Sequence, residues 1–254
     1  MLFTRAVVRT PADTLVKGLT TANLGKPDYE KSVLQHQRYV KALEDLGLQV
    51  MVLPMDDRFP DSVFVEDTAV VTPDFGIVTR PGAPTRRDEV VEMERVLNRY
   101  FVDTERIDYP GTVDGGDVMQ ADNRFFIGIS KRTNEDGAEQ LSKKLQKHGF
   151  EVSILKVENT LHLKSDMAYL GDDILVVTQN FANHPDYKAF KKIVVPEEER
   201  YAANCIRING TVLVAEGFPK TRELIEKEGF NTVALDVSEF RKLDGGLSCL
   251  SLRF

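Results

Sequence analysis

The residues of this chain that could carry nucleophilic chemistry are its two cysteines and four histidines. Cys249 lies in the segment DGGLSCLSLRF, five residues before the terminal Phe254. A thiolate is a strong nucleophile, but a free thiol has a pKa of ~8.5 and needs help to ionise. His162 lies in NTLHLKSDMAYL with apolar neighbours on both sides, where a histidine is more often packed than catalytic. Beside a cysteine, however, it is the best candidate for a general acid and base.

The second cysteine, Cys205 in AANCIRING, occupies a position similar to that of Cys249. Both are expected in strands that face one axis, so position alone does not choose the nucleophile. Cys249 follows KLDGG, a glycine turn that lets a ligand approach the backbone. Cys205 follows RYAAN, which offers no such opening, and we interpret it as a small buried hydrophobe.

Carboxylates gather where the predicted hairpins begin. They are Asp61, Glu66 and Asp67 in FPDSVFVED, and Asp114 and Asp117 in VDGGDV. Because a carboxylate pairs strongly and directionally with a guanidinium, a mouth lined by these acids would fit a guanidinium or ammonium group. Arginines follow the second strands of two hairpins and could hold a carboxylate, although most such side chains are solvated surface charges: Arg80, Arg86, Arg87 and Arg132.

The composition of the 254 residues is that of a globular protein, with 42% hydrophobic and 29% charged residues. The net charge of −7 argues against a nucleic-acid groove, which needs clustered lysine and arginine. No apolar run reaches the length of a membrane span, and the N-terminus lacks the apolar core of a signal peptide. These features predict a cytoplasmic protein without nucleic-acid or membrane partners, whose cysteines are free thiols.

Three segments share a pattern of an amphipathic helix end, a glycine and an alternating strand: residues 42–55, 144–157 and 224–237. Gly47, Gly149 and Gly229 are predicted to cap the helices, since glycine adopts positive φ without strain. A looser copy without glycine covers residues 96–109. His36 lies in the helix that precedes Gly47 and is expected on its surface.

A second pattern of two strands joined by a tight turn covers residues 65–80, 115–130, 166–179 and 203–217. The turns are predicted at Pro73-Asp74, Asp122-Asn123, Gly171-Asp172 and Asn209-Gly210. The order of hairpin, helix and strand repeats about every 50 residues, which favours a radial or stacked array. The first strand, LFTRAVVRT, and the last, LSCLSLRF, lack hairpin partners, so their pairing would make a fifth unit and close a ring.

Together the motifs FPDSVFVED, TRPGAPTRR, GTVDGGDVM, SKRTNEDGAEQL, LHLKSDMAYL, YAANCI and DGGLSCLSLRF resemble dimethylarginine dimethylaminohydrolase. The resemblance runs the full length in order, without the extra helical domain of arginine deiminases. It implies the pentein fold, an α/β propeller of five ββαβ units closed by the terminal strands, with residues 1–254 forming one domain.

The resemblance also implies the roles of site residues. Cys249 would be the nucleophile, His162 the general acid and base, and Asp114 the acid that orients His162 or the substrate, where bacterial members can have a glutamate. The residues implied to bind substrate are Glu66 and Asp67 at the guanidinium, Asp61 near the ammonium, Arg86 and Arg132 at the α-carboxylate, and Leu19, Phe64 and Leu243. Leu19 lies in KGLTTANLGKPDY, which resembles the family's mobile lid.

The implied reaction converts methylated arginine to citrulline and an amine through a thiouronium on Cys249, without cofactor or metal. The sequence leaves open whether the preferred substrate is methylated or unmethylated arginine, and whether the chain forms a homodimer. A non-catalytic pentein, such as the ribosome anti-association factor of that fold, would not need a thiol, a histidine and an acidic mouth together. A generic α/β domain with buried cysteines would explain none of this clustering.

Overall fold

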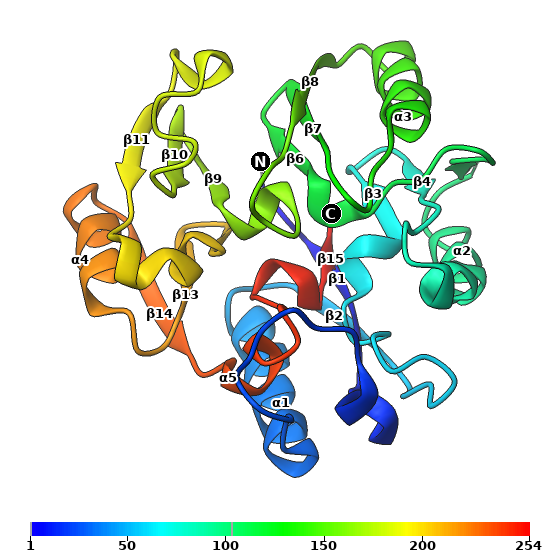
Figure 1. The fold of residues 1–254 in the computed structure, drawn as a ribbon, viewed down its shortest axis with the longest axis horizontal. Helices are drawn as coiled ribbons and strands as arrows, with labels where there is room; N and C mark the ends of the chain where they lie inside the picture. The colour runs from blue at the N-terminus through cyan, green and yellow to red at the C-terminus, as the bar shows by residue number, and fades with distance from the viewer. Residues whose placement is uncertain (1, 103) are drawn as a thin grey trace.

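The computed structural model describes residues 2–102 and 104–254, whose strands form five three-stranded sheets around a central axis (Figure 1). In each sheet the middle strand pairs antiparallel with an inner strand and parallel with an outer strand. In that order of inner, middle and outer, the sheets are β15 (Leu252–Arg253), β1 (Arg5–Arg9) and β2 (Gln49–Leu53); β3 (Ala69–Val71), β4 (Gly76–Val78) and β5 (Glu105–Arg106); β6 (Val118–Ala121), β7 (Arg124–Ile129) and β8 (Glu151–Lys156); β9 (Met167–Gly171), β10 (Ile174–Val177) and β11 (Lys191–Val194); and β12 (Ile206–Ile208), β13 (Thr211–Ala215) and β14 (Asn231–Leu235).

The predicted fifth unit is confirmed. β15 pairs antiparallel with β1, with Ala6 opposite Arg253 and Val7 opposite Leu252. The four predicted hairpins are also present, and Asp122, Asp172 and Asn209 take positive φ in their turns. Asp and Asn tolerate this conformation better than other residues with a side chain, which is why the turn signals were readable in the sequence.

Four of the five units carry a helix between the middle and outer strands: α1 (Tyr29–Asp45), α2 (Val90–Leu97), α3 (Glu135–Lys147) and α4 (Pro219–Lys227). Gly47, Gly149 and Gly229 have φ of +93°, +86° and +91°, as their predicted capping role requires. The unit of β9, β10 and β11 instead crosses through the 3-10 helix η6 (Pro185–Tyr187). Aromatic residues of this crossing segment pack into the unit's core in place of a helix: Phe181, Tyr187 and Phe190.

The prediction that His36 lies on the helix surface is wrong. The buried face of α1 consists of residues three and four apart, Ser32, Gln35, His36, Tyr39 and Leu43. His36 occupies one of these core positions, and burial lowers its pKa to about 4. A short helix, α5 (Ser238–Arg241), packs against α1 near the chain's end.

A 3-10 helix precedes each inner strand at one end of the ring. These turns are η2 (Val65–Thr68), η4 (Gly115–Asp117), η5 (Leu163–Ser165), η7 (Glu197–Ala203) and η8 (Ser248–Leu250). The expectation that Cys249 lies in a strand is therefore corrected, because it lies in η8. The backbone N–H of Ser248 bonds the Asn204 side chain (3.0 Å) rather than a neighbouring strand, and only residues 252–253 join the sheet.

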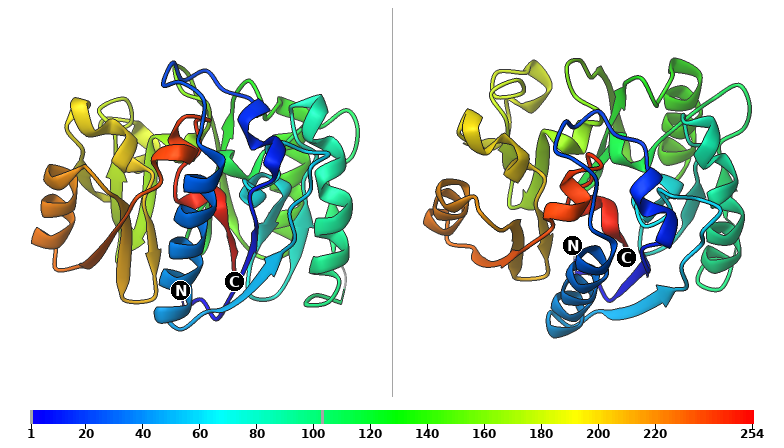
Figure 2. Two further views of the ribbon diagram at one scale, coloured as in Figure 1. Left: turned by 90° about the horizontal axis from the view of Figure 1, so that it is seen from below. Right: turned by 60° about the horizontal axis from the view of Figure 1, so that its bottom comes forward.

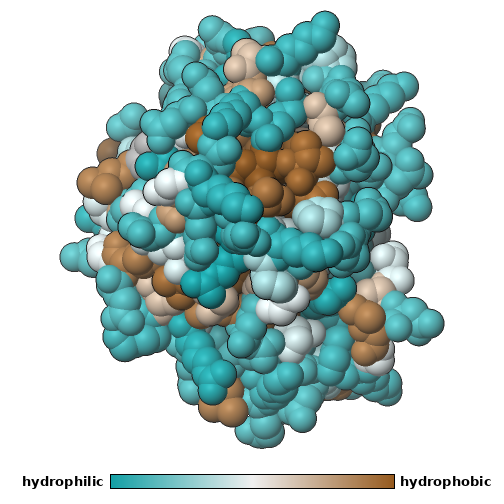
Figure 3. All heavy atoms as spheres, turned by 90° about the vertical axis from the view of Figure 1, so that its left-hand side faces the viewer, coloured by the Kyte–Doolittle hydropathy of each residue, from teal (hydrophilic) through white to brown (hydrophobic). Residues whose placement is uncertain are grey.

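Side views place this ring of turns at one end of the propeller, under the loop that follows the 3-10 helix η1 (Asp13–Lys17) (Figure 2). The side of the molecule nearest α4 and β11 is largely hydrophilic and carries one compact apolar patch (Figure 3). Among the described residues, no helix combines the length and apolar character that a membrane crossing would need.

Candidate active site

Ten of the eleven residues predicted for the site line one cleft at the end of the ring that carries the 3-10 turns. The cleft has a volume of about 360 Å³, including its open mouth. The ten residues are Leu19, Asp61, Phe64, Asp67, Arg86, Asp114, Arg132, His162, Leu243 and Cys249. They come from several units of the propeller, and the arrangement of these units around the axis brings them together.

Glu66, the eleventh, faces the other way. It lines a separate central cavity between the inner strands, and its carboxylate accepts bonds from Lys164 Nζ (2.6 Å), Arg253 (3.1 Å) and Ser248 Oγ (2.8 Å). Successive side chains on a 3-10 helix are about 120° apart. The neighbouring Glu66 and Asp67 of η2 therefore lie on opposite sides of the turn, and Glu66 supports the cleft from behind.

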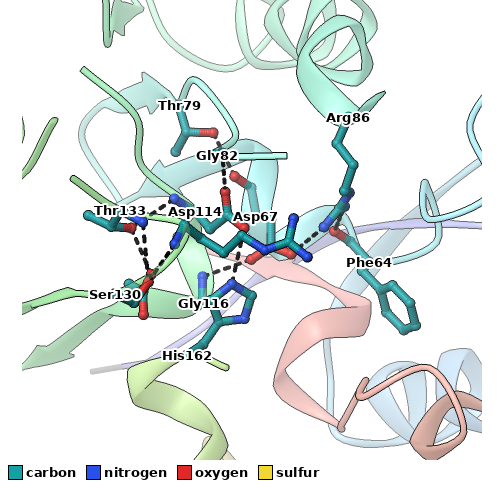
Figure 4. A network of polar contacts seen from close by, with 12 residues as sticks. Phe64, Asp67, Thr79, Gly82, Arg86, Asp114, Gly116, Ser130, Thr133 and His162 are labelled. Atoms are coloured by element: carbon teal, nitrogen blue, oxygen red, sulfur yellow. Dashed lines mark hydrogen bonds and ion pairs between the residues drawn. The ribbon is translucent and has the colours of Figure 1, made fainter. Parts of the chain in front are cut away.

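His162 and Asp114 form a buried pair, with His162 Nε2 3.0 Å from Asp114 Oδ2 (Figure 4). The second carboxylate oxygen of Asp114 accepts the backbone N–H of Gly82 (2.8 Å), which fixes the carboxylate plane. Gly116 packs directly against the imidazole: a Cβ there would lie 2.7 Å from His162 Nδ1. The GGD motif therefore needs glycine at this position to admit the histidine.

Asp117 connects the histidine turn to the loop that carries Arg132. Its fully buried carboxylate accepts bonds from Leu163 N (3.0 Å), Ser130 Oγ (2.6 Å) and Thr133 Oγ1 (2.7 Å). Ser130 Oγ in turn accepts the backbone N–H of Arg132 (2.9 Å). Burial raises the pKa of Asp117 to about 6. In the sequence, Asp117 stood out only as one of five acids near the predicted hairpins.

The resting site holds a charged histidine and a neutral thiol. Burial opposes protonation of His162, but Asp67, Asp117 and Asp114 outweigh it and raise its pKa to about 9. Burial also raises the pKa of Cys249 to about 12, with Glu66 and Asp67 adding to the effect. A cation bound between the acids and the sulfur would reverse this bias and favour the thiolate.

The two cysteines differ in their surroundings rather than in their acidity. Burial raises the pKa of Cys205 to about 12 as well. Cys205 is 2% exposed and lines the central cavity, whereas Cys249 is partly exposed and shares the cleft with His162. Only Cys249 is placed to meet a ligand that also contacts the histidine and the acids.

Asp67, Asp114 and His162 each offer a ligand atom, and these atoms lie within 4.8 Å of one another. Among the described residues, these three side chains form the one cluster that could hold a metal ion. The same atoms already have protein partners, however. Asp67 accepts hydrogen bonds from Gly116 N (3.0 Å) and Arg86 Nη1 (2.5 Å), and His162 bonds Asp114.

Replacing Asp114 with asparagine is expected to lower the pKa of His162 by roughly 1–3 pH units, because an opposite charge and its hydrogen bond are lost. In the parent the folded state binds this proton more tightly than the unfolded chain. While Asp114 is ionised, the proton on His162 therefore stabilises the fold fully below pH 6.5, and this contribution is lost as pH rises through about 9. In Asp114→Asn the folded pKa of His162 lies closer to 6.5, so the pH range over which this stability is lost should narrow.

Histidine NMR titration of the parent and Asp114→Asn measures this effect directly, with His36, His148 and His184 as internal controls. An unchanged midpoint for His162 would mean that Asp114 does not hold its charge.

At the far end of the cleft, Asp61 Oδ1 accepts the backbone N–H of Leu19 (2.9 Å), which ties the loop above the site to its wall. Burial raises the pKa of Asp61, although the nearby Arg86 and Arg132 partly offset this. Asp244 also holds the loop, because its carboxylate accepts the backbone N–H of Thr21 (2.5 Å). The backbone of Asp244 has a φ of +59°. The sequence did not identify Leu161, Asp244 and Gly245 as lining residues. The DGG turn was the signal for Asp244 and Gly245, and the neighbouring His162 was the signal for Leu161.

The two arginines predicted to bind a carboxylate differ in environment. Arg86 is 5% exposed, and its guanidinium already bonds Asp67 (2.5 Å), Glu89 (2.8 Å) and the carbonyl oxygen of Phe64 (2.9 Å). Within residues 2–102 and 104–254, no side chain bonds the guanidinium of Arg132. Arg132 is therefore the freer of the two cations in this cleft.

A family model described as N,N dimethylarginine dimethylhydrolase, eukaryotic, matches residues 22–251. The chain is also 46% identical to the N(G),N(G)-dimethylarginine dimethylaminohydrolase of Pseudomonas aeruginosa, over 100% of both chains. The chain belongs to the dimethylarginine dimethylaminohydrolase family. A second family member, from Streptomyces coelicolor, is 35% identical over 98% of this chain and 96% of its own.

Solved structures of the dimethylarginine dimethylaminohydrolase family confirm the predicted fold. The P. aeruginosa C249S mutant complexed with citrulline superposes with a TM-score of 0.99 over the whole of both chains. The N-terminal domain of ArgZ, an arginine dihydrolase from cyanobacteria, has a TM-score of 0.86 at 19% identity, over 98% of this chain and 97% of its own. That second likeness extends to the fold alone.

Proposed function

We propose that this chain hydrolyses Nω-methylated arginines to citrulline and the corresponding methylamine, with Cys249 as nucleophile. The observation that carries this proposal is the single cleft that combines a thiol, a charged histidine paired with Asp114, further carboxylates and Arg132. Such a cleft offers complementary charge to a ligand with a guanidinium at one end and an amino-acid group at the other. The 46% identity to the P. aeruginosa enzyme supports the same reaction.

In the first step the guanidinium lies against Asp67 and Asp114. Its positive charge lowers the pKa of Cys249, so the thiol releases its proton to water and becomes a thiolate. The thiolate attacks the guanidinium carbon and forms a sulfur–carbon bond. His162, protonated in the resting site, gives its proton to the departing methylated nitrogen as the carbon–nitrogen bond breaks. The amine leaves, and an S-alkylthiouronium remains on Cys249.

In the second step the now neutral His162 takes a proton from water, and the hydroxide attacks the same carbon. The sulfur–carbon bond breaks, and the hydroxyl proton of the adduct passes to the departing sulfur. Citrulline is thereby released and the thiol is restored. One group thus acts first as acid and then as base. Asp114 keeps the imidazole oriented for both transfers through its 3.0 Å bond. A solved H162G adduct of a dimethylarginine dimethylaminohydrolase with S-methyl-L-thiocitrulline supports a covalent pathway of this kind.

The experiment that tests the proposed function compares amine release from asymmetric dimethylarginine, monomethylarginine and arginine at equal concentration. We expect the methylated substrates to be turned over with the larger kcat/KM. A larger value for arginine would favour the alternative of an arginine hydrolase on the same fold. The cytoplasmic location and the homodimer stay predictions.

Arg132 is proposed to bind the substrate α-carboxylate. Arg132→Ala should lower kcat/KM for dimethylarginine by about tenfold to hundredfold, since a hydrogen bond to a charged group is worth ~1.5–3 kcal/mol. The loss should shrink for the decarboxylated analogue, which has no carboxylate to bind. Lys131→Ala, which removes the neighbouring exposed cation, is the matched control. Equal losses of Arg132→Ala on both substrates would contradict this role.

Arg86 was predicted to share that role, but its buried bonds support a different proposal, in which it holds Asp67 and η2 in place. Arg86→Ala should then reduce activity on both substrates and lower the melting temperature. Removal of one partner from a buried ion pair costs about 3–5 kcal/mol. A loss confined to the substrate with a carboxylate would restore the original prediction.

A further inference from the structure

Asn204 lies between the turn that carries Cys249 and the turn that carries His162. It follows η7 and is 5% exposed. Its Nδ2 donates to the carbonyl oxygen of Lys164 in η5 (2.7 Å) and to Ser248 Oγ in η8 (2.9 Å). Its Oδ1 accepts the backbone N–H of Ser248 (3.0 Å). Both donor hydrogens and the acceptor of this amide are therefore used to join η5 and η8.

The same side chain supports the backbone before Cys249. Gly246 lies against Asn204, and a Cβ at Gly246 would be 2.4 Å from Asn204 Oδ1. The backbone N–H of Gly246 partly offsets the burial that raises the pKa of Cys249. On the other side, Ser248 Oγ donates to Glu66 Oε2 (2.8 Å), which fixes the direction of the hydroxyl that receives the amide.

We propose that Asn204 is a positioning residue, which sets the placement of Cys249 relative to His162 by clamping their two turns together. The inference rests on the proposed function, which gives Cys249 and His162 their catalytic roles. Asn204 does not line the cleft side of these turns and would not touch substrate. Its effect is geometric, and a misplacement of reacting groups by about 1 Å can cost a hundredfold in rate.

The chain offers a matched control in the same hairpin. Asn209, at the other end of β12, also uses its whole amide: Oδ1 accepts Phe3 N (2.9 Å), and Nδ2 donates to the carbonyl oxygens of Phe3 and Leu46 (each 3.1 Å). Replacing either asparagine with aspartate keeps the shape and removes two donors. The two variants thus lose the same two donors, Asn204→Asp between η5 and η8 and Asn209→Asp at the other end of β12.

The test measures kcat, KM and melting temperature for Asn204→Asp and Asn209→Asp with dimethylarginine. We expect Asn204→Asp to lower kcat by at least about tenfold, with KM changed less than about threefold, because reacting groups move while the substrate contacts stay. Asn209→Asp should keep kcat within about twofold at a similar loss of melting temperature. Equal effects on kcat, or an unchanged kcat in Asn204→Asp, would overturn the inference.

If Asn204→Asp does not fold, Ser248→Ala decides the question. It removes the hydroxyl that receives one amide bond and leaves the backbone bond of Ser248, so kcat should fall by about threefold or more. An unchanged kcat would overturn the inference. Cys249→Ser in the same assay separates the two proposals. Retained turnover there would refute the proposed function itself, whereas loss of turnover with a normal Asn204→Asp would refute only the clamp.

Discussion

Replacing Cys249 with serine is expected to lower kcat for dimethylarginine by roughly 10³-fold or more, because loss of a nucleophile removes the covalent route. Serine is nearly isosteric, but its hydroxyl is not ionised at neutral pH and its oxygen is a weaker nucleophile. The fold should persist, because Cys249 is partly exposed and the contact between its sulfur and Ser248 Oγ is a long one of 4.0 Å. The measurement is steady-state citrulline formation alongside the melting temperature.

Cys205→Ser is the matched control, because the second thiol lies in a neighbouring unit and burial raises its pKa to about 12 as well. It should retain activity within about threefold, while losing some stability through the burial of a hydroxyl at a 2% exposed position. Full activity in a well-folded Cys249→Ser variant, or loss of activity in Cys205→Ser alone, would show that the nucleophile is assigned to the wrong residue.

His162→Gly should produce an enzyme that forms the covalent adduct but clears it slowly. Without the imidazole, the amine of dimethylarginine lacks a proton donor and water lacks a base, so kcat should fall by about 10²–10⁴-fold, the usual range of general acid–base catalysis. S-methyl-L-thiocitrulline loses a thiolate, which departs without a proton. The variant should therefore accumulate adduct with this substrate far more readily than with dimethylarginine.

Intact-protein mass spectrometry over time checks this expectation, with His184→Ala as the control for removal of a histidine outside the cleft. If His162→Gly turned over both substrates at the parental rate, His162 would be a packed residue without a role in proton transfer.

The repeat architecture was readable because its signals are local. Alternating strands, positive-φ turns such as Asn209 and capping glycines such as Gly149 each depend on a few neighbouring residues. The ring closure followed from the two unpaired end strands. The missing helix before β11 was not foreseen, because the aromatic residues around Tyr187 cover that sheet through tertiary packing.

Most of the residues that line the cleft could be predicted from the sequence, but their geometry could not. Glu66 and Asp67 are adjacent acids that the sequence cannot distinguish, and only the 3-10 turn sends them to opposite sides. The pairing of Arg86 with Asp67 and Glu89 depends on long-range burial. Asn204 escaped notice because its partners lie 40 and 44 residues away in the chain, and an isolated asparagine before a strand carries no signal of such a clamp.

In the proposed reaction, a covalent bond forms between Cys249 and the guanidinium carbon. Acid quenching of the parent enzyme during turnover of dimethylarginine, followed by peptide mass spectrometry, tests it most directly. We expect the peptide containing Cys249 to gain the mass of the substrate less its dimethylamine, and this gain should disappear once the substrate is exhausted. A turning-over enzyme whose Cys249 peptide never changes mass, or whose added mass lies on Cys205, would contradict it.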